Sequence, residues 1–273
     1  MRAIIERGYF VSKIYAIANQ KGGVGKTTTC VNLAASLVAT KKRVLLIDID
    51  PQGNATMGSG VHKDEVPLSI YEVLVEDEKI SAATQQSPSG HYAVIAANSD
   101  LTAAEVLLLE LPEKQFRLRN ALAEVKNNYD YVLIDCPPSL NMLTLNALVA
   151  CDGVIIPMQC EYYSLEGISA LINTIDQIKQ KLNPSLSIEG IVRTMYDPRS
   201  SLTNEVSDQL KTHFGDKLYQ ACIPRNVRLA EAPSFGQPAL VYDRQSKGAI
   251  AYLALAGEFI RRSDRLQQQA VNV

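Results

Sequence analysis

The residues best suited to chemistry form a glycine-rich run with two lysines near the start of the chain: Asn19-Gln20-Lys21-Gly22-Gly23-Val24-Gly25-Lys26-Thr27-Thr28. An apolar run precedes it and a helical pattern of apolar residues follows it. Glycines let successive backbone N–H groups turn toward phosphate oxygens, and the next helix adds the positive end of its dipole. Lys26 offers a cation to the β- and γ-phosphates, and the Thr27 hydroxyl suits Mg²⁺. This order predicts a phosphate-binding loop for a nucleoside triphosphate; the alternative is a glycine-rich turn that contains a lysine by chance.

Three aspartates follow apolar runs that predict strands. Asp48 and Asp50 follow one run, and Asp135 follows another. Because the carboxyl ends of parallel strands meet at one edge of a sheet, these carboxylates should lie beside the phosphate-binding loop. A hard carboxylate at Asp135 suits Mg²⁺, commonly through water, and Asp48 suits a group just behind the metal ligands. The alternative for Asp50 is a turn, shaped by Pro51, that its side chain caps.

The elements that position these residues show a regular alternation. Short apolar runs that predict buried strands lie at residues 13–18, 43–47, 92–96, 131–134, 154–156, 188–192 and 217–221. Helical patterns lie between them, clearest over residues 165–182, where apolar residues recur at steps of three and four. The alternation predicts an α/β fold: a doubly wound, mostly parallel sheet with helices on both faces.

The organisation of the chain follows from the same pattern. We expect one domain over residues 13–265, a disordered N-terminal extension over residues 1–12 and a polar tail over residues 266–273. Residues 85–90, rich in Ser, Gln and Pro, predict a surface loop.

Composition narrows the class of protein. The chain has 273 residues, of which 47% are hydrophobic, enough for a substantial core. Its formal net charge of -2 means that any nucleic-acid binding must come from a local patch. No segment approaches the ~20 apolar residues of a membrane span, and the N-terminus lacks secretory-signal features, so we expect a cytoplasmic protein. The five cysteines are scattered singly, which favours inert thiols over metal ligands.

The glycine-rich loop departs from the ordinary pattern. Gln20 stands where the first glycine is expected, and Lys21 adds a second lysine. The run K-G-G-V-G-K-T-T resembles the deviant Walker A motif of the ParA/Soj/MinD family of ATPases, which are P-loop NTPases. The resemblance runs from about Ser12 to the region of Phe259. Residues 160–167 and 226–234 resemble the chromosomal ParA (Soj) branch rather than MinD or the nitrogenase iron protein.

This resemblance implies roles for particular residues. Lys21 would reach across a nucleotide-sandwich dimer to the partner's ATP, and Asp50 would position the attacking water. The implied catalytic set is thus Lys21, Lys26 and Asp50, with Thr27, Asp48 and Asp135 around Mg²⁺. Pro224 and Asn226 would contact adenine. The alternatives are a solvated loop lysine at Lys21 and a plain strand-to-helix turn at residues 224–226.

The resemblance also implies a DNA surface. Arg199 and Arg228 match positions at which chromosomal ParA proteins bind DNA without sequence specificity, and Lys247 would extend the same patch. Such binding depends on phosphate neutralisation and weakens with salt. Neither arginine lies in a basic run, so the sequence alone favours solvated surface charges.

The function implied by the resemblance is chromosome partitioning by a weak ATPase. ATP would close a homodimer that binds double-stranded DNA in the nucleoid, and a ParB-like partner would stimulate hydrolysis. Two alternatives remain: a MinD-like positioning ATPase on the membrane surface, and a metabolic or cluster-maturation ATPase of the same fold. Without a C-terminal basic amphipathic tail, we expect no membrane partner.

Overall fold

A single sheet organises the chain in the computed structural model, which describes residues 12–125, 127–162 and 164–271. Within these ranges the strands are β1 (Lys13–Ile17), β2 (Val44–Asp48), β3 (Thr84–Gln86), β4 (Ala93–Ile95), β5 (Tyr131–Asp135), β6 (Gly153–Gln159), β7 (Ser187–Tyr196) and β8 (Leu218–Pro224). Their order across the sheet is β3-β4-β2-β5-β1-β6-β7-β8. All neighbours pair in parallel except β3 and β4. The predicted doubly wound, mostly parallel α/β sheet is therefore confirmed.

The central strands are buried on both faces, as their apolar runs predict. Every residue of β2 and β5 is buried. Along β2, Leu45 and Ile47 point into one core, whereas Val44 and Leu46 point into the other. This alternation places apolar side chains against helices on each side of the sheet.

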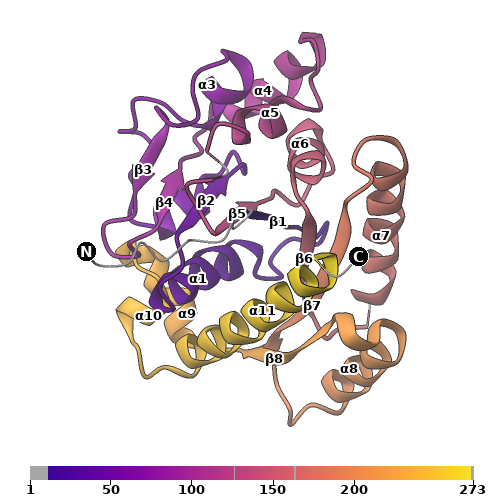
Figure 1. Ribbon diagram of the computed structural model, residues 1–273. Helices are drawn as coiled ribbons and strands as arrows, with labels where there is room; N and C mark the ends of the chain where they lie inside the picture. Colours follow the sequence, from indigo (N-terminus) through magenta and orange to yellow (C-terminus); the bar gives the residue numbers. More distant parts are fainter. Residues whose placement is uncertain (1–11, 126, 163, 272–273) are drawn as a thin grey trace, which may run out of the picture.

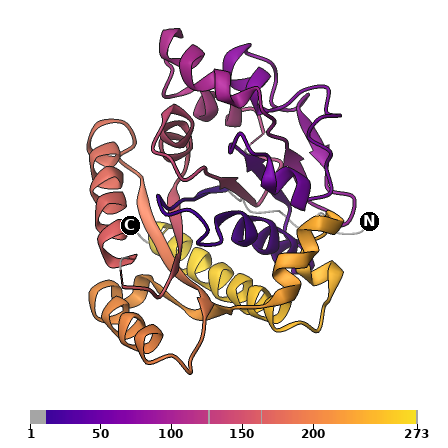
Figure 2. The same cartoon turned by 180° about the vertical axis from the view of Figure 1, so that it is seen from behind.

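Helices form a layer on each face (Figures 1 and 2). In chain order they are α1 (Lys26–Ala39), α2 (Asn54–Gly58), α3 (Ile70–Val75), α4 (Leu101–Leu107), the 3-10 turn η1 (Leu108–Glu110), α5 (Arg117–Leu122), α6 (Met142–Ala150), α7 (Ser164–Lys181), α8 (Ser201–Phe214), η2 (Gly215–Lys217), α9 (Val227–Glu231), η3 (Ala232–Phe235), α10 (Ala239–Tyr242) and α11 (Lys247–Val271). α1 and α11 lie side by side on one face. There, Phe259 packs against Tyr15 and Tyr131, with ring centroids 4.9 and 5.1 Å apart.

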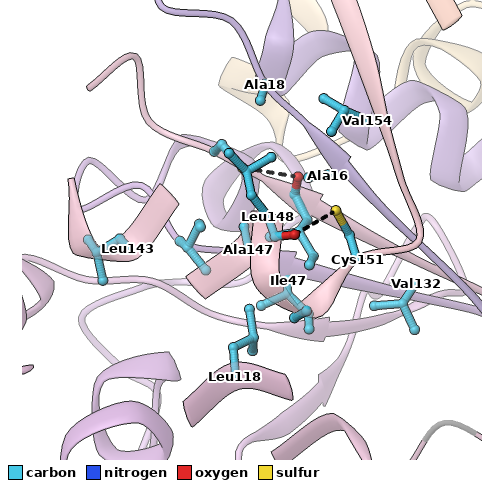
Figure 3. Packing of buried hydrophobic residues seen from close by; sticks show 14 of the residues in the cluster. Ala16, Ala18, Ile47, Leu118, Val132, Leu143, Ala147, Leu148, Cys151 and Val154 are labelled. Carbon is cyan, nitrogen blue, oxygen red and sulfur yellow. Dashed lines mark hydrogen bonds between the residues drawn. The ribbon is translucent and has the colours of Figure 1, made fainter. Parts of the chain in front are cut away.

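On the opposite face, α6 is apolar around most of its circumference and is buried accordingly. Leu143, Ala147 and Leu148 pack in the same cluster as Ala16 of β1 and Val132 of β5 (Figure 3). α6 directly follows the segment after β5. The packing of α6 therefore holds in place the segment that follows Asp135.

One expectation meets a different structure. The loop predicted over residues 85–90 is wrong at its start, because Gln85 and Gln86 belong to β3. β3 is a short, polar edge strand that pairs antiparallel with β4, so it carries no apolar run by which to recognise it. α11 continues through the predicted tail as far as Val271. The predicted N-terminal extension lies outside the described residues except for Ser12, which is buried.

Candidate nucleotide-binding site

The glycine-rich loop joins the end of β1 to the start of α1. Gly23 and Gly25 have φ values of +72° and +88°, the left-handed region that glycine adopts without strain. A Cβ atom added at Gly22 or Gly23 would meet no atom within 4 Å, so the loop presents an open backbone surface. Gly25 caps α1 and offers no side chain to its first turn. Such a helix start suits an anion.

Neighbouring strands hold this loop in shape. The Thr194 hydroxyl of β7 donates to the Val24 carbonyl at 2.8 Å. The Asn19 side chain donates to the Pro157 carbonyl of β6 at 2.8 Å and accepts from the Lys21 N–H at 3.0 Å. The loop is thus tied to both β6 and β7, and little of it needs to reorganise around a phosphate chain.

Lys26 lies inside the loop, with 7% of its surface exposed. Its Nζ atom donates to the Lys21 carbonyl at 3.2 Å. Burial lowers the pKa of Lys26, and the nearby Asp135 carboxylate opposes that shift. Burial of this cation beside a neutral carbonyl is unfavourable, so phosphate oxygens near Lys26 would be strongly attracted to it.

Thr27 and Asp135 meet where Mg²⁺ was predicted. The Thr27 hydroxyl donates to Asp135 Oδ2 at 2.8 Å. Asp135 is fully buried, and among the described residues its Oδ1 atom has no hydrogen-bond partner. Burial, reinforced by Asp48, raises the pKa of Asp135 well above its usual value. A divalent cation would satisfy this buried oxygen, so the residues present fit Mg²⁺.

Asp48 lies opposite Asp135 in the β2–β5 register, but its oxygens are already engaged. Oδ1 accepts from the Asp50 N–H at 3.1 Å, and Oδ2 accepts from the N–H and hydroxyl of Thr56, each at 2.8 Å. Burial raises the pKa of Asp48 to about 6. Asp48 therefore braces the turn that carries Asp50. Its predicted place behind the metal ligands stays a prediction.

The Asp50 side chain caps the turn after β2, which is the alternative considered for this residue. Its Oδ1 atom accepts from the Gln52 N–H at 3.0 Å, and the side chain is half-buried. Capping a turn does not prevent a carboxylate from orienting water, because each of its oxygens accepts more than one hydrogen bond. The catalytic role of Asp50 stays a prediction.

Lys21 points away from the loop. Its Nζ atom forms an ion pair with Glu161 Oε2 at 2.6 Å, and the two side chains are 38% and 52% exposed. Glu161 follows β6, at the same edge of the sheet. The second lysine is therefore accessible on the surface beside the loop, where it could meet another molecule.

A cavity of about 230 Å³ lies beside the loop. Pro224 and Asn226 line it together with Gly25, Thr28 and Thr194. The structure thus brings the residues predicted to contact adenine next to the phosphate loop. Asn226 also caps α9 by accepting from the Arg228 N–H at 3.1 Å.

Comparisons with known proteins decide the family. A family model described as an AAA domain matches residues 12–188. The sporulation initiation inhibitor protein Soj of Bacillus subtilis is 52% identical over 91% of this chain and 98% of its own. The chromosome partitioning protein ParA of Myxococcus xanthus is 50% identical over 94% of this chain and 91% of its own. The chain belongs to the ParA/Soj family of chromosome-partitioning ATPases.

A solved structure agrees with this assignment of fold. Cobyrinic acid a,c-diamide synthase from Mycobacterium smegmatis, solved with an ATP analogue and magnesium, is 37% identical to this ParA/Soj chain. It superposes with a TM-score of 0.82 over 93% of this chain and 96% of its own. That relative shows that the fold accommodates a nucleotide with magnesium.

The arginines predicted to contact DNA in this ParA/Soj chain follow two adjacent strands. β7 pairs in parallel with β8, so the turn that carries Arg199 and the helix α9 that carries Arg228 follow the same edge of the sheet. Arg199 is 88% exposed and pairs with Asp197 at 2.8 Å. Arg228 pairs with Glu231 at 2.8 Å and with Asp243 at 3.3 Å.

Lys247 is exposed at the start of α11, close to the same segment. A Cβ atom at the adjacent Gly248 would approach Leu229, the neighbour of Arg228, to 2.6 Å. The structure therefore brings the segments of Lys247 and Arg228 together. Each arginine already has carboxylate partners, which lowers the local positive charge.

Three residues that shape the site were not foreseen. Thr56 and Thr194 hold Asp48 and the loop, and Glu161 holds Lys21. Glu161 lies in a segment that resembles the family, which was the only signal for it. Among the described residues, no helix combines the length and the hydropathy of a membrane span.

Proposed function

We propose that this chain is an ATP-dependent dimerising switch that binds duplex DNA without sequence specificity and acts in chromosome partitioning. In this proposal the protein is cytoplasmic and associates with the nucleoid. The observation that carries the proposal is its identity of 50–52% to ParA and Soj proteins over nearly their whole lengths. The loop, the cavity beside it and the exposed second lysine are the parts such a switch requires.

In this proposal the loop binds the phosphates of ATP. Its N–H groups and Lys26 meet the β- and γ-phosphate oxygens, and the cavity at Pro224 and Asn226 takes the base. Thr27 and Asp135 hold Mg²⁺, which neutralises charge on the phosphates when it is bound. Asp50 orients the attacking water, while Asp48 fixes the turn that presents it.

Dimerisation depends on Lys21 exchanging one anion for another. In the single chain Lys21 pairs with Glu161, an exposed ion pair worth only about 0–1 kcal/mol. A triphosphate bound to the facing protomer offers a stronger partner, so the lysine leaves Glu161 and links the two copies. Loss of the γ-phosphate removes that partner and reopens the dimer.

DNA binding follows from pairing two weak surfaces. Each protomer contributes Arg199, Arg228 and Lys247, and joining two such sets raises the effective concentration of the second. Phosphate must displace the carboxylates that pair with the arginines, so binding is weak for one protomer and sensitive to salt. A ParB-like partner would stimulate an otherwise slow hydrolysis.

Retention on duplex DNA tests this function. The protein should bind immobilised DNA with ATP, and not with ADP or without nucleotide. Raising the salt concentration from about 50 to 200 mM should release it. Equal retention in all three nucleotide states would overturn the proposal.

A second candidate rests on one comparison, the structural relative named cobyrinic acid a,c-diamide synthase. A metabolic ATPase of this fold would show no DNA retention in any nucleotide state. The identity to that relative is 37%, against 50–52% to the partitioning proteins, and this favours the first proposal. A MinD-like positioning ATPase would instead bind anionic liposomes with ATP.

A further inference from the structure

An apolar groove lies in the helical layer opposite α1 and α11, outside the nucleotide site. α6 forms its floor and contacts both α4 and α7, which form its walls. The groove has a volume of about 700 Å³. Most residues that line it are apolar: Val106, Leu109, Leu140, Met142, Leu145, Ile178 and Leu182.

Large apolar side chains are exposed along one rim of this groove. Val106 is 64% exposed, Leu109 is 53% exposed and Leu140 is 44% exposed. Apolar side chains gathered in one hollow, rather than scattered singly over a surface, are typical of an interaction site. Leu140 follows Asp135 by five positions in the sequence.

We propose that this groove binds one amphipathic helix of a partner protein. A third helix fits between two helical walls above a helical floor, and peptide helices are recognised this way through apolar residues spaced three or four apart. The wall formed by α7 and the residue after it runs from Thr174 to Leu182. At 1.5 Å per residue that wall is about 12 Å long, so the bound helix makes contact over two to three turns.

The charges of the two walls define the flanks of that helix. Glu105 lines the α4 wall and is held there by the side-chain amide of Asn141. Lys181 lines the α7 wall in the last turn of the helix. A complementary helix carries lysine or arginine on the flank that faces α4 and carboxylates on the flank that faces α7. This pairing of opposite charges favours a peptide helix over a purely apolar ligand such as an acyl chain.

Selection from a displayed library of helical peptides tests the proposal. We expect enriched peptides with an apolar stripe and oppositely charged flanks. Their affinity should fall at least tenfold for the Val106→Asp/Leu109→Asp variant, whose exposed positions tolerate a charge. ATP binding by the same variant reports that its fold is intact. Enrichment of no such peptides, or equal affinity for the variant, overturns the proposal.

Reversal of one charge in the groove distinguishes specific peptide binding there from non-specific electrostatic attraction. Lys181→Glu should weaken the best peptide several-fold, and a peptide with lysine on that flank should recover the loss. Lys179→Glu is the matched control, since Lys179 shares the last turn but does not line the groove. Equal effects of the two variants would contradict the proposal. Self-association of the protein that Val106→Asp abolishes would also contradict it, because the occupant would then be a second copy.

Discussion

The Thr27 hydroxyl donates a hydrogen bond of 2.8 Å to Asp135, joining the first turn of α1 to the end of β5. The two residues are separated by most of the first half of the chain, and the parallel pairing of β1 with β5 brings them together. The bond engages one carboxylate oxygen and leaves the other buried without a partner in the described structure. The free oxygen can ligate a cation. Without a cation, burial of an unpaired carboxylate oxygen is unfavourable for the free energy of folding.

Binding of ATP with Mg²⁺ should therefore release protons. Burial raises the pKa of Asp135 well above its usual value, and a cation beside the carboxylate lowers it again. Calorimetric titration at several pH values between about 5 and 8, in buffers of different ionisation enthalpy, measures the protons released. Wild type should release up to about one proton per site more than Asp135→Asn. Equal release by the two proteins would count against a metal site at Asp135.

The free energy of unfolding of the nucleotide-free protein should depend on pH through the titration of Asp48. Burial raises the pKa of Asp48 from 3.8 to about 6, so between these values the folded state binds more protons than the unfolded state. The stabilisation from protonated Asp48 is complete below about pH 4 and is lost as the pH rises through about 6.

Urea denaturation of wild type and Asp48→Asn between pH 4 and 7 checks this prediction. The wild-type free energy of unfolding should fall relative to the variant by roughly 2 kcal/mol over this range, because each unit of pKa shift corresponds to about 1.4 kcal/mol and part of the shift is lost already near pH 4. The variant removes the titrating group and keeps the size of the side chain. Parallel curves for the two proteins would show that Asp48 titrates normally.

Lys26→Ala should weaken ATP binding at least about tenfold, since a hydrogen bond to a charged group contributes roughly 1.5–3 kcal/mol. Lys26 is buried in the loop, whereas Lys21 pairs with Glu161 at the surface. Lys21→Ala is thus the matched control and should keep its affinity for ATP within a few-fold. Anisotropy of a fluorescent ATP analogue at low protein concentration measures both. Similar losses in the two variants would mean that the roles of the lysines are wrongly divided.

Much of the fold could be predicted because its signals are local. The central strands are short apolar runs, and the loop between β1 and α1 combines glycines with Lys26 and Thr27 in a fixed order. β3 could not be predicted, since a short, polar and partly exposed edge strand leaves no periodic pattern.

The missed site residues have a different cause. Thr194 reaches the loop from β7, and Glu161 reaches Lys21 from the end of β6. Their side chains are common polar types, and only the packing of distant strands makes them neighbours. The same holds for Asp243, which directly follows α10 in the sequence and pairs with Arg228.

Arg228→Ala should reduce ATP-dependent DNA binding and lower its dependence on salt. Removing one phosphate contact per protomer should reduce the slope of log affinity against log salt by about 2 for a dimer. Arg119→Ala is the matched control, because Arg119 is an exposed arginine on α5 that stacks on Phe116. DNA anisotropy at several salt concentrations measures both variants. If Arg228→Ala retains the wild-type slope, DNA binds elsewhere.

The central claim is that bound ATP joins two copies of the chain through Lys21. Light scattering of Asp50→Ala with saturating ATP and Mg²⁺ tests it most directly, because loss of hydrolysis should preserve the joined state. We predict a mass of twice 29.9 kDa with ATP, and 29.9 kDa with ADP or when Lys21→Ala is added. A mass that stays at 29.9 kDa with saturating ATP would contradict the account.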